Sequence, residues 1–304
     1  MKTADFAQYK AIIIPDCQCN TSLDTIRFLD DTKSVWSPAV TGNMVIIGTD
    51  PSFHHKWFKL AGADAMMNDS IKLVSTGENG TGMYMSLSCY YQSVAAPVSI
   101  SALSEIGDFR VRGNLSHPCL NNAHLVAKSD VMTSLTDELA SNWNCSVHEA
   151  FSEFPSNTSR GFQALAIALN ATGPGQRSFG DGTSGIPYII ARGATPVGCG
   201  NNKTEPQYNE ECDDGPANGK SGVLCSSSCQ CLFGMVTPGM CRSNTTSSST
   251  SSAQSSTLYT NSRYVGGYMS GGTAVLLTEV SVLLVQARAC RLPQIPRQVM
   301  ALRR

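Results

Sequence analysis

One short apolar run that ends abruptly in polar residues decides the fold, and it is Gly42–Asp50 (GNMVIIGTD). Two other runs end in the same way, Tyr9–Cys17 (YKAIIIPDC) and Gly82–Tyr91 (GMYMSLSCYY). Continuous apolar runs of this length, bounded by turn residues, are typical of strands buried on both faces of a parallel sheet. In such a sheet the functional groups gather in the loops that follow the strands.

The same pattern continues along the first two thirds of the chain. The strands expected from short apolar runs are Ala11–Ile14, Met44–Ile47, Met83–Leu87, Phe109–Val111, Leu125–Ala127, Ala164–Ala168 and Tyr188–Ala191. The helices expected from amphipathic spacing are Leu23–Asp31, His55–Met66 and Met132–Trp143. Strands alternating with helices predict an α/β domain over residues 1–195, with a mostly parallel sheet and helices on both faces.

The composition narrows the class of partner. The chain has 304 residues, a formal net charge of −1 and 41% hydrophobic residues, which is enough to bury a sizeable core. Near-neutral charge and the absence of a recognition motif argue against a nucleic-acid partner. No apolar run reaches about 18 residues, so no confident membrane-spanning helix is expected.

Two independent signals place the protein outside the cell. The chain has 12 cysteines, which is typical of disulfides in an oxidising compartment, with a zinc site as the alternative. About three N-x-S/T sequons are expected by chance for this composition. The sequence has nine, at Asn20, Asn68, Asn79, Asn114, Asn144, Asn157, Asn170, Asn202 and Asn244. We therefore expect an extracellular or cell-surface glycoprotein.

The start of the sequence does not match this expectation. Met1–Phe6 contains no apolar signal region, and the chain runs directly into the first strand. We expect a truncated or mis-started sequence whose signal is missing. The alternative is a cytosolic protein with accidental sequons.

The composition changes near Pro196. Residues 196–242 are short, polar and rich in cysteine, so disulfides must stabilise them as a separate module. The cysteines expected to pair there are Cys199, Cys212, Cys225, Cys229, Cys231 and Cys241, in an order that the sequence does not fix.

Residues 243–304 are expected to form a tail. Eleven of the fourteen residues 244–257 are Ser or Thr, which predicts a disordered stalk. The apolar run Thr273–Val285 and the arginine-rich end, which includes Cys290, fit a disordered or mis-spliced end, a damaged GPI signal or a membrane anchor. Membrane attachment is thus left open.

Cys89 is the candidate nucleophile. It lies where an apolar strand turns into the next element, and a helix after it would lower the pKa of the thiol. His148 is the candidate base, with Glu149 as its orienting partner. The alternative is a structural Cys89, either as a buried thiol or in a disulfide with Cys119 or Cys145. Cys17 and Cys19 are too close for an ordinary bridge and are expected to pair elsewhere.

These runs, together with Cys145–Phe151 (CSVHEAF), resemble the class I glutamine amidotransferase-like fold over residues 5–195. The resemblance implies a flavodoxin-like sheet, with a nucleophilic Cys at a strand-to-helix turn and a His-x-Glu pair. In this sequence the turn has no flanking glycines and His148 is adjacent to Glu149. The fold can therefore occur without glutamine hydrolysis.

The cysteine-rich module is similar to a secreted Cys-rich repeat of myxobacterial and eukaryotic surface proteins. The matching residues are Cys199-Gly200-Asn201, Glu205-Pro206, Glu210–Gly215 (EECDDG) and Cys225–Cys229 (CSSSC). Asp213 and Asp214 are expected to cap turns, with calcium binding as the alternative.

Asp50 and His54 are a weaker candidate pair for a metal site. A carboxylate and an imidazole suit zinc or iron, but a further ligand would be needed. The alternative is a strand-to-helix loop in which Asp50 accepts hydrogen bonds from backbone amides. We expect no bound metal and no cofactor.

The sequence leads to two hypotheses about function. In the first, the α/β domain is a binding or adhesion scaffold for an unknown extracellular ligand or a cell-surface or cell-wall component. In the second, the protein is a Cys-dependent hydrolase of an amide or ester that uses Cys89 and His148.

Overall fold

A computed structural model gives the fold. The structure describes residues 2–16, 18–19, 22–76, 80–113, 119–156, 161–200, 202–206, 210–226, 229–243 and 282–284. Cys17, Cys290 and nearly all of the expected tail lie outside the described residues.

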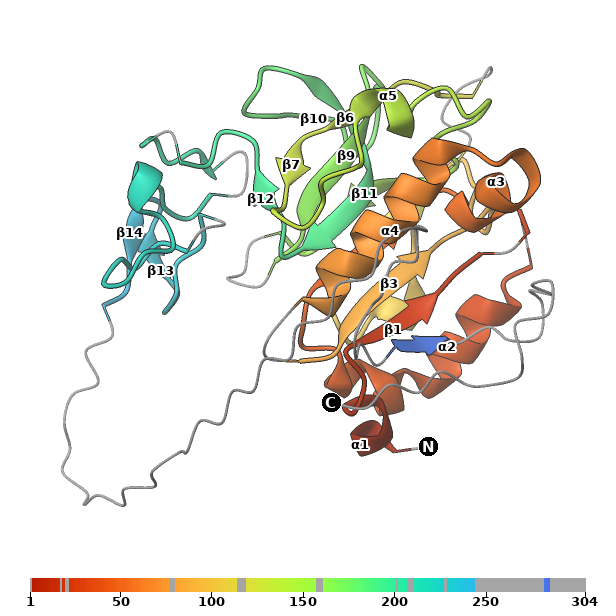
Figure 1. Cartoon of the computed structure of the whole chain (residues 1–304), viewed down its shortest axis with the longest axis horizontal. Coiled ribbons are helices and arrows are strands. Elements are labelled where there is room, and N and C mark those ends of the chain that lie inside the picture. Colours follow the sequence, from red (N-terminus) through yellow and green to blue (C-terminus); the bar gives the residue numbers. More distant parts are fainter. Residues whose placement is uncertain are drawn as a thin grey trace, which may run out of the picture.

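The first half of the chain alternates strands with helices (Figure 1). The elements there are α1 (Thr3–Phe6), β1 (Ala11–Ile14), α2 (Asp24–Trp36), β2 (Met44–Ile47), α3 (Pro51–Phe58), α4 (Ala61–Ser75) and β3 (Gly82–Ser86). The expected strands Ala11–Ile14 and Met44–Ile47 are confirmed residue by residue. The expected helix His55–Met66 is in fact two helices, because Lys59 adopts a left-handed conformation that ends α3.

The second half is dominated by strands. Its elements are β4 (Val98–Ser99), β5 (Arg110–Arg112), β6 (Ala123–Leu125), β7 (Ala127–Lys128), α5 (Asp137–Ala140), β8 (Ala150–Glu153), β9 (Gln163–Leu169), β10 (Arg177–Ser178), β11 (Ser184–Arg192) and β12 (Thr195–Pro196). Single 3₁₀ turns cover Ser37–Ala39, Ser101–Leu103 and Gly215–Ala217. The late elements are β13 (Met235–Thr237), β14 (Met240–Cys241) and β15 (Val282–Leu284).

The central sheet is mixed. Its strand order is β15-β1-β3-β2-β11-β9-β6, with β10 paired to β11. The pairs β15–β1, β1–β3 and β3–β2 are parallel, whereas β2–β11, β11–β9 and β9–β6 are antiparallel. The parallel arrangement expected from the sequence therefore holds for one half of the sheet. The expected helix Met132–Trp143 is reduced to the four residues of α5, so the described residues between the later strands contain no helix long enough for a parallel crossover.

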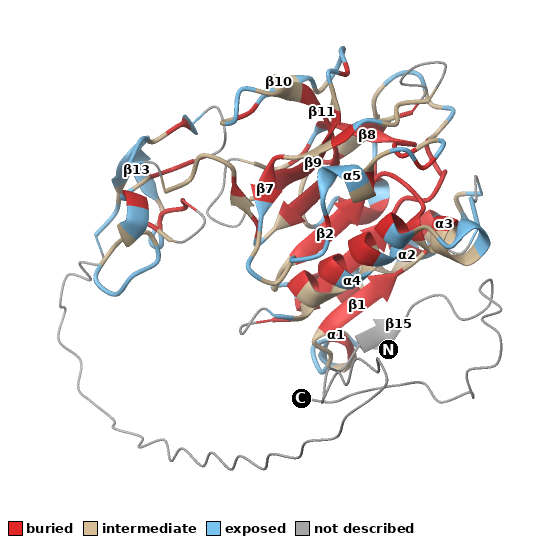
Figure 2. Cartoon of the chain, turned by 45° about the horizontal axis from the view of Figure 1, so that its top comes forward, coloured by how far each residue is buried: buried red, intermediate tan, exposed pale blue. Residues whose placement is uncertain are grey.

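Helices cover both faces of the parallel half. Ile26, Leu29 and Trp36 of α2 pack in one apolar cluster with Ile12 and Ile46. Met66 and Leu73 of α4 pack in another cluster with Ile13, Val45 and Tyr84. Successive strand residues thus point to opposite faces, as a pleated strand requires. Figure 2 shows the resulting buried strands beneath α4.

The cysteine-rich segment has its own small core. Cys212, Cys225 and Cys231 form a separate buried cluster, and the short strands β13 and β14 pair beside it. The disulfides there are Cys199–Cys229, Cys212–Cys225 and Cys231–Cys241, so all six expected cysteines are paired. The disulfides supply the stability that so few buried apolar side chains cannot provide.

Asp213 caps turns in this segment, as expected. Its carboxylate accepts hydrogen bonds from the backbone amides of Gly200 and Gly215 and from the Asn218 side chain. These hydrogen bonds outweigh burial and hold the pKa of Asp213 below its usual value. No helix of the described residues is long and apolar enough to cross a membrane.

Candidate functional site: a sealed cysteine beside two histidines and buried acids

The site lies where the parallel strands end. Asp16 follows β1, Asp50 follows β2, and Ser88 and Cys89 follow β3, while His148 and Glu149 immediately precede β8. All of these side chains are buried. The sequence-based expectation that the loops after the strands meet is therefore confirmed for Asp16, Asp50 and Cys89.

Gly48 brings the His148–Glu149 segment to the sheet. The backbone amides of His148 and Glu149 both donate to the Gly48 carbonyl, at 3.0 Å each. A Cβ on residue 48 would lie 2.1 Å from the carbonyl oxygen of Glu149, so only glycine permits this approach.

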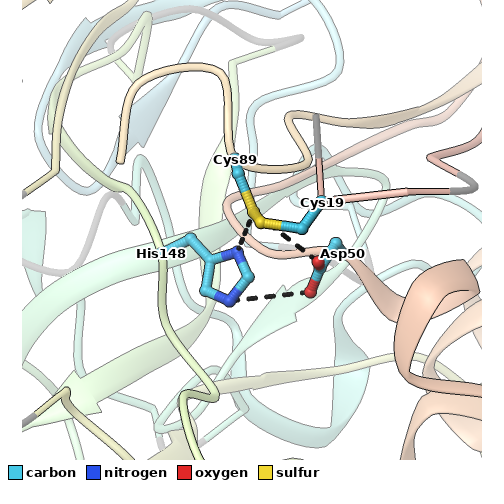
Figure 3. A group of neighbouring side chains, drawn as sticks. All are labelled: Cys19, Asp50, Cys89 and His148. Carbon is cyan, nitrogen blue, oxygen red and sulfur yellow. Dashed lines mark hydrogen bonds and ion pairs between the residues drawn. A yellow bond between two sulfur atoms is a disulfide. The ribbon is translucent and has the colours of Figure 1, made fainter. Parts of the chain in front are cut away.

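His148 lies beside Cys89, as predicted. The distance from Cys89 Sγ to His148 Nδ1 is 3.1 Å (Figure 3). The other ring nitrogen, Nε2, lies 3.6 Å from Asp50 Oδ1, and Asp50 Oδ2 lies 3.6 Å from Cys89 Sγ. Sulfur, imidazole and carboxylate therefore have the order of a nucleophile, a base and an orienting acid.

Glu149 does not take the orienting role expected from the sequence. Its Oε1 accepts a hydrogen bond from the backbone amide of Tyr91 at 2.8 Å, so the carboxyl group faces the turn after β3 rather than the imidazole. Adjacent side chains on an extended backbone point in opposite directions, which explains the result. Asp50 takes the place beside the ring.

Cys89 is not a free thiol. It forms a disulfide with Cys19, and no described cysteine is unpaired. The expected partners of a bridged Cys89, Cys119 and Cys145, instead pair with each other. The tertiary structure brings the loop after β1 next to the loop after β3, a juxtaposition that follows from the parallel pairing of these strands.

The turn after β3 also differs from the expectation. Turns rather than a helix follow Cys89, so no helix amides act on its sulfur. The residue with a left-handed backbone is Ser88, at φ 56°, and its hydroxyl donates to the carbonyl of Gln18 at 2.8 Å. A non-glycine residue in this conformation at a strand end is a mark of a constrained site, and the sequence gives no signal for it.

The site carries an excess of acid. Burial, together with the nearby Asp50 carboxylate, raises the pKa of Asp16 to about 7. Burial also raises the pKa of Glu149 well above its ordinary value. Asp50 Oδ1 lies 3.1 Å from His54 Nε2 and 3.6 Å from His148 Nε2. Burial thus favours the protonated forms of Asp16 and Glu149, and two imidazoles lie beside the Asp50 carboxyl group.

Asp50 and His54, the weak metal candidates, are brought together at the start of α3. Asp50 does not cap the helix with its side chain, contrary to the alternative considered from the sequence. The ligand atoms of Cys19, Asp50, Cys89 and His148 lie within 4.8 Å of one another. In the disulfide, however, neither sulfur is the thiolate that zinc or iron would bind.

The comparisons with known proteins add no relative. The chain matches no protein-family model, no curated protein and no solved structure.

Proposed function

We propose that the protein is a secreted or cell-surface glycoprotein whose α/β domain serves as a binding or adhesion scaffold. The observation that carries the proposal is the Cys19–Cys89 disulfide. It occupies the sulfur that a hydrolase would need, in a site where the neighbouring side chains are buried.

The extracellular setting has two supports. Five disulfides join described cysteines, a density typical of oxidising compartments. The four sequon asparagines that the structure describes, Asn68, Asn144, Asn170 and Asn202, are all exposed. An exposed asparagine is what N-glycosylation requires. The other five lie outside the described residues.

The cysteine-rich segment offers an exposed apolar surface for a partner. Its exposed side chains are Leu232, Phe233, Met235, Val236 and Met240, on and around the β13–β14 hairpin. An exposed apolar cluster on a small disulfide module is typical of a protein–protein contact. An amidotransferase-like domain over residues 1–195 and a Cys-rich repeat over residues 196–242 remain part of this proposal.

Secretory expression tests the setting and the surface together. Mass spectrometry of the unreduced protein should find glycans on several of the nine asparagines and Cys89 linked to Cys19. The wild-type chain and a Phe233→Ser/Met240→Ser variant are then applied to cell surfaces and cell-wall preparations. We expect wild-type binding and at least about a tenfold loss in the double variant.

The control is Phe28→Ser, which removes an exposed aromatic side chain from α2 and should bind like wild type. Absence of glycans would contradict the proposed setting. Equal binding by the Phe233→Ser/Met240→Ser variant and wild type would contradict the proposed surface.

A Cys-dependent hydrolase of an amide or ester is the second candidate, favoured by the distances among Cys89, His148 and Asp50. It requires the reduced protein. Hydrolysis of amide and ester libraries should appear after mild reduction and be abolished in Cys89→Ala. Equal rates in the reduced wild type and Cys89→Ala would contradict it.

A further inference from the structure

We propose that the Cys19–Cys89 disulfide is exchangeable and accepts two electrons from an extracellular dithiol. The inference goes beyond a scaffold function and does not require that the protein bind or hydrolyse anything. It rests on an asymmetry between the two sulfurs and on the side chains that surround one of them (Figure 3).

The two halves of the bridge differ in exposure. Cys19 is exposed, whereas Cys89 is 1% exposed. A thiolate can form a mixed disulfide only with a sulfur that it can approach. Attack is therefore directed to Cys19, and Cys89 becomes the leaving sulfur.

The leaving sulfur has a proton donor at hand. His148 Nδ1 lies 3.1 Å from Cys89 Sγ and 3.0 Å from the Ser88 carbonyl oxygen. Since a carbonyl oxygen only accepts, this contact places a hydrogen on Nδ1. Nε2 faces the Asp50 carboxylate, which stabilises a positive charge on the ring. A leaving thiolate that is stabilised in this way departs faster.

The exchange takes place in two steps. One thiolate of the dithiol attacks Cys19 Sγ, and the Cys19–Cys89 S–S bond breaks. Cys89 Sγ keeps the electron pair of the broken bond and takes a proton from His148, which regains a proton from solvent. The second thiolate of the dithiol then attacks the mixed disulfide and expels Cys19 as a thiolate, which takes a proton from solvent. The dithiol is oxidised to a disulfide, and the Cys19–Cys89 pair gains two electrons and two protons.

The Cys119–Cys145 bridge is an internal control in the same part of the chain. Both of its residues are half-buried, and Cys145 Sγ lies 3.7 Å from the Val147 carbonyl oxygen. A carbonyl oxygen has no proton to give a leaving sulfur. This bridge should therefore react slowly.

The experiment uses the full glycosylated chain and dithiothreitol as the probe. Free thiols are first blocked with N-ethylmaleimide, and the protein is then treated with low concentrations of dithiothreitol without oxygen. Samples are quenched with acid, alkylated with an isotope-labelled maleimide and mapped by mass spectrometry. We expect Cys19–Cys89 to be reduced at least about tenfold faster than Cys119–Cys145.

A His148→Gln variant separates the effect of the imidazole on the reduction rate from the effect of the exposure of Cys19. It should slow reduction of Cys19–Cys89 by about tenfold while leaving the rate at Cys119–Cys145 unchanged. A monothiol, glutathione, should be found on Cys19 and not on Cys89.

Equal reduction rates at the two bridges in the wild type, or glutathione on Cys89, would overturn the proposal. An unchanged rate in a folded His148→Gln variant would also do so. The wild-type comparison needs no variant, so the proposal stays testable even if His148→Gln fails to fold.

Discussion

At the scale of single residues, burial decides which acids carry charge. Asp16 is 2% exposed, its Oδ2 accepts a long hydrogen bond from the backbone amide of Phe53 at 3.3 Å, and its Oδ1 has no hydrogen-bond partner among the described residues. An ionised carboxylate in this position is poorly compensated. The proton that Asp16 retains is thus a consequence of the fold and not of its neighbours in the sequence.

Asp16→Asn should change the pH dependence of stability. The pKa of Asp16 is about 7 in the folded chain and close to 3.8 when unfolded, so the folded state binds more protons between these values. The contribution of Asp16 to the free energy of unfolding is therefore fully present below pH 4 and is lost as the pH rises toward 7. The variant should lose this slope and be more stable than wild type above pH 7, by at most about 4 kcal/mol. Urea denaturation of both proteins from pH 4 to 8 measures the free energy of unfolding. If it varied with pH in parallel for the wild type and the variant, Asp16 would be ionised throughout this range.

At the scale of elements, single contacts hold neighbouring segments in place. The buried Asp69 of α4 accepts hydrogen bonds from the backbone amides of Ser134 and Leu135 and from the Ser134 hydroxyl, at 2.7–2.8 Å. Gly48 similarly fixes the segment before β8. These contacts explain how a chain with only a four-residue α5 still positions its long loops.

Asp69→Ala should destabilise the fold by about 3 kcal/mol, because it leaves two backbone amides of the 134–135 loop without their acceptor. The variant keeps the Asn68 sequon, so glycosylation is not altered. Asp64→Ala, on the exposed side of the same helix, is the control and should change stability by less than about 0.5 kcal/mol. Similar melting curves for the two variants would contradict the role of Asp69.

Gly48→Ala should displace the His148–Glu149 segment, because the new Cβ meets backbone rather than a flexible side chain. We expect a loss of about 2 kcal/mol or more in unfolding free energy. We also expect slower reduction of the Cys19–Cys89 disulfide, since the displacement moves His148 away from Cys89 Sγ. A variant with wild-type stability and an unchanged reduction rate would show that the close approach is dispensable.

At the scale of the whole molecule, the edge of the sheet is held by charge. His124 of β6 contacts Asp137 of α5 through Nδ1 and Asp181 of the turn before β11 through Nε2. The structure places His124 half-buried at the edge strand, between two carboxylates.

His124→Asn should remove a pH-dependent part of the stability. Burial alone would lower the pKa of His124, but the hydrogen bonds to Asp181 and Asp137 outweigh it and raise the pKa. The stabilisation is fully present below the unfolded pKa near 6.5 and is lost as the pH rises through the folded value. The free energy of unfolding of the wild type should therefore exceed that of His124→Asn by about 1 kcal/mol at pH 6, and the difference should shrink toward pH 8. A constant difference in thermal unfolding across this range would contradict the prediction.

The sequence by itself determined the local features. Runs of apolar β-branched residues predicted β1 and β2 residue by residue, and cysteine density predicted the bridged module. It also identified Cys89, His148 and Asp50 as candidates. These results follow from periodicity, burial and composition, which act over a few neighbouring residues.

Only the tertiary structure decided the partners. Cys19 and Cys89 are 70 residues apart, and their bridge depends on β1 pairing with β3. Which strands become neighbours also decides three further features. Asp50 rather than Glu149 lies beside His148, Ser88 has a left-handed backbone, and half of the sheet is antiparallel. Strand pairing is a long-range outcome of packing, so no local pattern encodes it.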